Sequence, residues 1–135
     1  MTQSYVEWEL DYENGLDPYD PYGKIRIIGD VGSLEDDCTY IDVFLEAFVD
    51  GIQLTEIGKT VRIAPLIEPN DIIFRFEPNS IHLSYGSQTA IISNRQKFAT
   101  DLHESIKEFV EILDELAMHG EQEKCPLLKL RHYIS

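Results

Sequence analysis

The sequence predicts an α+β fold, in which one antiparallel sheet of about six strands carries two helices on one face. Three observations support this prediction. Short segments with alternating apolar and polar residues recur along the chain, as expected of strands with one buried face. Two longer segments have apolar residues at helical spacing. Tight turns join the later strands, and no βαβ unit with phosphate-binding glycines occurs, so the strands are expected to run antiparallel.

The chain has 135 residues, a size typical of one domain, and a single domain over residues 1–135 is expected. Alternation from Val6 to Tyr12 predicts a first strand whose solvent face carries only acidic side chains. A loop with the doubled tripeptide Asp-Pro-Tyr, residues 17–22, follows it. The segment KIRIIGDV then predicts a second strand that ends at Gly29 or Gly32. The expected order of elements is β-β-α-β-β-β-β-α.

The segment from residue 39 to residue 57 fits both a helix and a strand. Thr39 and Asp42 resemble a capping box, and Gly58 suits a left-handed helix stop. The segment is also longer than a usual strand, so we favour a helix. Gly51 weighs against the helix, because glycine in a helix interior costs about 1 kcal/mol relative to alanine.

Four short strands and a long helix are expected after this segment. The turn signals Pro78-Asn79 and Gly86-Ser87 predict an antiparallel meander. Ser93 with Gln96 resembles another capping box, and an apolar stripe runs from there to Met118, before a stop at Gly120. The tail, residues 120–135, is apolar enough that we expect it to dock on the body. The four predicted strands are KTVRIA, DIIFRF, SIHLSY and TAIIS.

The net charge of −14, from 25 acidic and 11 basic residues, restricts the class of partner. Binding to nucleic-acid phosphates or to anionic membranes requires Lys and Arg, so neither is expected. Residues 1–50 hold 13 acids and 2 bases, a net charge of −11, so the surface is polarised. This distribution favours a basic protein partner, although acidic residues also serve simply to keep a small protein soluble.

The sequence contains no recognisable catalytic, cofactor or metal motif. There is no GxSxG elbow, no phosphate-binding glycine loop and no zinc-ligand spacing among the four histidines. The two cysteines are Cys38, among carboxylates that disfavour a thiolate, and Cys125. Isolated cysteines, together with the lack of a signal peptide or an apolar membrane span, predict a cytoplasmic protein. The sequence assigns no oligomeric state.

Acidic and aromatic residues of the first 50 positions are the candidate partner-binding residues. Proline stiffens the doubled tripeptide, and its tyrosines offer rigid contact area beside carboxylates. In the first helix, acids at i, i+4 and i+8 repel one another mildly, and we expect that nothing relieves this stripe. The alternative interpretation is a solvated face with a loop that covers the sheet edge. The predicted set is Asp17, Tyr19, Asp20, Tyr22, Glu35, Asp36, Asp37, Asp42, Glu46 and Asp50.

The segments WELDYENGLDPYDPYGKIRI and TYIDVFLEAFVDGI resemble those of small acidic bacterial proteins, similar to the immunity proteins encoded beside polymorphic or contact-dependent toxins. The resemblance is one of size, charge and architecture over the whole chain, and it carries over no functional residue. It implies a cytoplasmic protein that neutralises a basic partner, such as a nuclease toxin, by covering its active site.

Two further functions remain open at this level. One is an enzyme that uses carboxylates, with or without a divalent cation, which predicts two acids with raised pKa values in one pocket. The other is a structural homo-oligomer, whose interface would have to avoid the acidic face.

Overall fold

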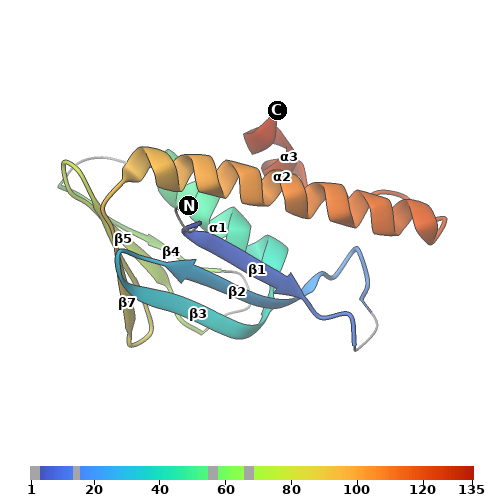
Figure 1. Cartoon of the computed structure of the whole chain (residues 1–135), viewed down its shortest axis with the longest axis horizontal. Helices are drawn as coiled ribbons and strands as arrows, with labels where there is room; N and C mark the ends of the chain where they lie inside the picture. Colours follow the sequence, from blue (N-terminus) through green and yellow to red (C-terminus); the bar gives the residue numbers. More distant parts are fainter. Residues whose placement is uncertain (1–3, 14–15, 55–57, 66–68) are drawn as a thin grey trace.

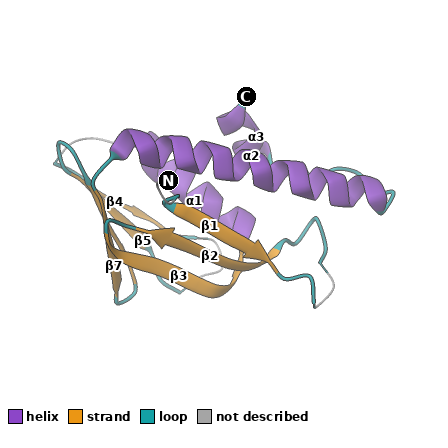
Figure 2. Cartoon of the chain, viewed as in Figure 1, coloured by secondary structure: helices purple, strands orange, loops and turns teal. Residues whose placement is uncertain are grey.

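The computed structural model describes residues 4–13, 16–54, 58–65 and 69–135, and in them it confirms the α+β class. One antiparallel sheet contains seven strands, and α1 and α2 pack on one of its faces (Figures 1 and 2). The strands are β1 Val6–Leu10, β2 Tyr22–Ile28, β3 Val31–Tyr40, β4 Thr60–Ile63, β5 Ile72–Phe76, β6 Ile81–Tyr85 and β7 Gln88–Ile92. The helices are α1 Ile41–Gln53, α2 Arg95–His119 and α3 Leu128–Ile134.

Two antiparallel meanders meet in the middle of the sheet, whose order is β1-β2-β3-β7-β6-β5-β4. The central pair, β3 and β7, is joined through Val31 opposite Ile91 and Gly32 opposite Ala90. Beyond this short ladder the Gln88 side chain links the two strands. It accepts a hydrogen bond from the Glu35 amide at 2.8 Å and donates one to the Glu35 carbonyl at 3.0 Å. A side chain therefore replaces the missing backbone pairing at the centre of the sheet.

One core lies between the sheet and the helices, and aromatic side chains fill much of it. Phe48 of α1 contacts Phe74 of β5 and Phe98 of α2, with ring centroids 5.4 Å and 6.0 Å apart. Gly51 faces the Phe74 ring so closely that a Cβ on this residue would overlap three ring atoms. The glycine that argues against a helix in the sequence thus serves the packing of that helix on the sheet.

The structure differs from the sequence prediction chiefly around α1. The helix is confirmed, but it begins at Ile41 after β3, and Tyr40 at its N-cap makes no side-chain capping bond. Thr39, predicted to cap it, is buried in β3. The helix ends at Gln53, so Gly58 is not its stop. The prediction missed β3 because this strand carries one buried aliphatic residue, Leu34, amid polar ones.

The later elements follow the sequence with small shifts. The side chain of Asn94, not Ser93, caps α2 by accepting from the Lys97 amide at 3.0 Å, and Gly120 is the C-cap. In the tail, the short helix α3 lies against α2, and Cys125, Leu127 and Leu130 are buried in the core cluster. None of the helices described is long and apolar enough to cross a membrane.

Candidate protein-binding surface

The doubled tripeptide folds into a tight turn between β1 and β2. The Asp20 amide donates to the Asp17 carbonyl at 3.0 Å, and the Tyr19 amide donates to the Asp17 carboxylate at 2.9 Å. Pro18 and Pro21 are buried, whereas Asp17, Tyr19 and Asp20 are exposed. The prolines therefore anchor the loop, and the acidic and aromatic side chains are left at the surface.

The two tyrosines of the repeat have different roles. The Tyr19 hydroxyl donates to the carbonyl of Glu123 at 2.7 Å, which ties the loop to the connection between α2 and α3. Tyr22 lies on the sheet face away from the helices, with its ring edge-to-face with Tyr40 at 5.5 Å. A hydrogen bond with the Cys38 side chain, followed by burial, raises the pKa of Tyr22 to about 12. Tyr19 thus braces the fold, whereas the Tyr22 ring lies at the surface.

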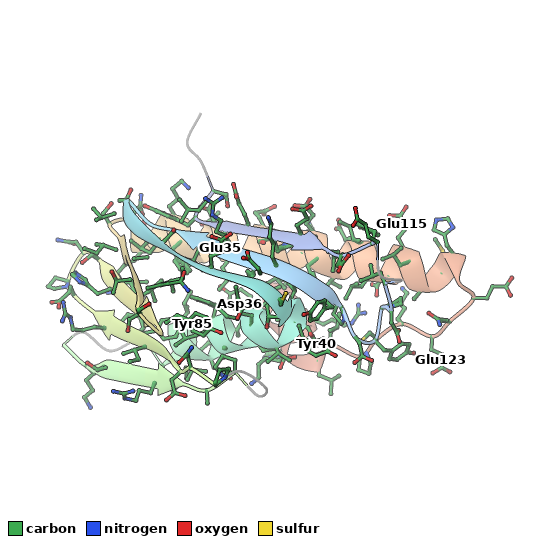
Figure 3. The ribbon with its side chains drawn as sticks, turned by 90° about the horizontal axis from the view of Figure 1, so that it is seen from below. Glu35, Asp36, Tyr40, Tyr85, Glu115 and Glu123 are labelled. Carbon is green, nitrogen blue, oxygen red and sulfur yellow. The ribbon has the colours of Figure 1, made fainter. Side chains whose placement is uncertain are left out.

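The acidic run at residues 35–37 lies on β3. Glu35 lies opposite Arg26 on the outer face of the sheet. Asp36 faces inward and accepts a hydrogen bond from the Tyr85 hydroxyl at 2.7 Å (Figure 3), so its carboxylate serves the fold. Asp37 is exposed. Alternation along the strand thus separates Asp36 from the other two acids, and of these two only Asp37 lines the groove beside the loop.

The acidic stripe of α1 consists of Asp42, Glu46 and Asp50. It is half-buried, and its charge is partly neutralised by the tail. Lys129 of α3 donates to the Asp50 carboxylate at 2.8 Å. Burial raises the pKa of Glu46, and the neighbouring Asp42 raises it further, whereas Lys129 lowers it. The expectation that nothing relieves this stripe is wrong, because its counter-charge comes from a residue far along the chain.

Asp42 is the most deeply buried carboxylate of the stripe. Its Oδ1 atom is buried without a hydrogen-bond partner in the described part of the chain. Burial is the largest cause that raises its pKa, and the charge of Asp20 raises it further. Asp42 therefore lies close to the loop, but it is poorly accessible to a partner.

We expect Asp42→Asn to raise the free energy of unfolding at pH 7 by about 1 kcal/mol, because it removes a buried charge that lacks a full set of partners. A raised pKa means that the ionised carboxylate is unfavourable in the folded state. The gain should therefore be present at neutral pH and shrink as the pH falls through the pKa of folded Asp42. Chemical denaturation of both proteins across acidic pH checks this. A loss of stability would show that the helix dipole at the start of α1 outweighs the burial.

The exposed members of the predicted set gather at one end of the sheet with two residues that sequence reasoning missed. A groove of about 460 Å³ there is lined by Tyr12, Glu13, Tyr22, Asp37 and Cys38, among others. Tyr12 was assigned to the buried face of the first strand, but β1 ends at Leu10 and Tyr12 is 59% exposed. We call the exposed residues at this end the loop-end surface: Tyr12, Glu13, Asp17, Tyr19, Asp20, Tyr22 and Asp37.

The loop-end surface combines four carboxylates with three tyrosines that are 36–59% exposed. Lys24 also lines this groove, but its charge is partly neutralised by Glu9, whose carboxylate oxygen lies 3.9 Å from the Lys24 nitrogen. The groove therefore remains acidic as a whole. Among the described residues, no three His, Cys, Asp or Glu side chains converge as a metal site would require. Comparisons of the chain with protein-family models, curated proteins and solved structures found no match.

Proposed function

We propose that this protein acts in the cytoplasm as a binding protein that neutralises a basic protein partner, as an immunity protein neutralises a nuclease toxin. The observation that carries the proposal is the loop-end surface. Tyrosines supply contact area at small entropic cost, and the carboxylates around them attract a positively charged active site. An inhibitor of this kind covers the site that the partner uses to bind nucleic-acid phosphates.

The uneven distribution of acidic residues along the chain supports the same function. Acidic residues steer a basic partner toward the end of the sheet where they are concentrated, which raises the association rate at low ionic strength. The buried prolines and the Tyr19–Glu123 hydrogen bond hold the loop before binding. A loop ordered in advance loses less conformational entropy when the complex forms.

One observation favours the alternative, a carboxylate-based enzyme: Asp42 and Glu46 lie one turn apart, and both have raised pKa values. Burial is the largest cause for both residues. The contact between α1 and the tail accounts for these shifts without a substrate, and Lys129 already binds the adjacent Asp50. We therefore place the binding function first.

Titration against a panel of basic nuclease domains tests the proposal. We expect one member to be inhibited at a stoichiometry of one to one, with an affinity that falls steeply as salt rises from low to physiological concentration. An acidic nuclease of similar size is the control and should be unaffected. Neither binding nor inhibition across the panel, even at low salt, would contradict the proposal.

A further inference from the structure

A second groove, which meets the loop-end surface at Tyr12, runs between the edge strand β1 and helix α2. It has a volume of about 640 Å³, and its lining includes Trp8 and Leu10 of β1 and Glu104, Glu108 and Ile112 of α2. Because β1 is the first strand in the sheet order, one of its sides pairs with β2 and the other is a sheet edge beside α2 (Figure 1). Residues of this edge line the groove. The groove thus combines a sheet edge with a helix wall.

The backbone of β1 directs hydrogen-bonding groups into this groove. The Ile28 amide donates to the Tyr5 carbonyl at 2.8 Å, and the Asp11 amide donates to the Tyr22 carbonyl at 2.9 Å. These bonds fix the alternation of the antiparallel ladder, in which residues 5, 7, 9 and 11 direct their backbone groups toward β2. Residues 6, 8 and 10 therefore direct theirs outward.

Two residues of this edge keep their backbone groups available. The Val6 amide and carbonyl both bond to the Ser4 hydroxyl, at 3.2 and 3.0 Å. In the described part of the chain, the backbone groups of Trp8 and Leu10 have no such partner. They offer two donors and two acceptors at the spacing of a strand, which is the template used in strand addition.

The side chains around the groove determine the charge of the occupant. Five carboxylates line it, with no lysine or arginine among the described lining residues: Glu7, Glu9, Asp101, Glu104 and Glu108. Three of them have a cation nearby. The Lys97 nitrogen lies 2.6 Å from an Asp101 oxygen. The distance is 3.9 Å between the side-chain nitrogen of Lys24 and an oxygen of Glu9, and 4.0 Å between Arg26 and Glu7. In the part of the chain described, Glu104 and Glu108 make no ion pair.

We propose that this groove binds an extended, lysine- or arginine-rich segment of another protein, which adds to the sheet as a strand beside β1. Its backbone bonds to Trp8 and Leu10, and its cationic side chains face Glu104 and Glu108 on the helix side, because alternate residues of a strand share one face. Glu7 and Glu9, on the outer side of β1, add to the attraction. The same carboxylates oppose pairing of β1 with a second copy of the chain, because like charges would then meet across the new ladder. This inference is independent of the function proposed for the loop-end surface.

The test uses a blocked seven-residue peptide of alternating lysine and valine as the probe. Trp8, the single tryptophan of the chain, lines the groove and reports binding by its fluorescence. Two further peptides keep the charge but carry N-methyl groups, one on the valine amides and the other on the lysine amides. Alternate amides of a strand point to opposite sides, so only one methylated peptide should lose affinity, by about tenfold or more.

Matched charge reversals on the protein complete the test. Glu104→Lys/Glu108→Lys should weaken binding of the parent peptide about tenfold at low salt. Glu121→Lys/Glu123→Lys alters the net charge equally at exposed positions outside the groove, and it should change binding less than about threefold.

Three results would overturn the inference. They are no binding of the parent peptide, equal binding of the two methylated peptides, or an equal effect of the two charge reversals. Failure of the proposed inhibition would leave these results unchanged, because the substitutions that test the loop-end surface lie outside this groove.

Discussion

Gly51→Val is expected to lower the free energy of unfolding by about 3 kcal/mol, through overlap of the new side chain with the Phe74 ring. The ring cannot easily move aside, because it is fully buried and packed against Phe48 and Phe76. Replacing glycine in a helix interior normally gains up to about 1 kcal/mol, so the overlap should decide the sign. Denaturant unfolding at neutral pH measures the difference.

Two companion variants separate overlap from helix propensity. Gln53→Val places the same β-branched residue at an exposed position in the last turn of α1, and it should change stability by less than about 1 kcal/mol. Phe74→Leu combined with Gly51→Val should cost less than the two single losses added together, since the shorter side chain makes room. A stable Gly51→Val protein would show that α1 does not pack on β5 as described.

Arg131→Met is expected to lower the free energy of unfolding by about 2 kcal/mol and to loosen the tail. The Arg131 guanidinium donates to both oxygens of Asp114, at 2.6 and 3.0 Å, and to the carbonyls of Cys125 and Pro126. Loss of one partner from a fully buried ion pair costs roughly 3–5 kcal/mol. The smaller value applies here because the Arg131 and Asp114 side chains are 32% and 21% exposed.

The tail itself reports this loosening. In a Cys38→Ser background, Cys125 is the only thiol, and it is buried. Its rate of labelling by a thiol reagent should rise in Arg131→Met. Lys129→Met, on the same helix, removes the more exposed ion pair with Asp50 and should cost less than about 1 kcal/mol. Equal effects of Arg131→Met and Lys129→Met would contradict the role given to Arg131.

The effect of Arg131→Met should also depend on pH. Hydrogen bonds from Arg131 lower the pKa of the Asp114 carboxyl, so folding favours its ionised form. The stabilisation is fully present above the ordinary aspartate pKa of about 3.9, and it disappears as the pH falls through the lower folded value. The difference in stability between the two proteins should therefore shrink in strong acid, to the part contributed by the bonds to the carbonyls of Cys125 and Pro126.

Local patterns in the sequence predicted much of the fold. Alternation in residues 72–76 and 81–85 identified β5 and β6, and the Gly86-Ser87 turn placed β7 beside β6. Gly86 adopts a φ of 60°, which glycine tolerates readily. These elements depend on neighbours in the sequence, so their patterns are visible without the structure.

Features that depend on distant residues were not predictable. β3 is a strand because it pairs with β2 and because Gln88 binds Glu35, not because of its own composition. Tyr85 binds Asp36, and Lys129 binds Asp50. Both acids were predicted to face a partner. Conversely, Tyr12 joins the loop-end surface because β1 stops two residues earlier than its alternation suggested.

The most direct test of the proposed function is the effect of the loop-end carboxylates on association with a basic nuclease of the panel. We predict that Asp20→Asn/Asp37→Asn lowers the association rate constant about tenfold at low salt, and that the difference fades at high salt. Asp71→Asn/Glu77→Gln removes the same charge at the two ends of β5 and should leave the rate nearly unchanged. Equal rates for the two variants at every ionic strength would contradict the claim that the loop-end surface receives the partner.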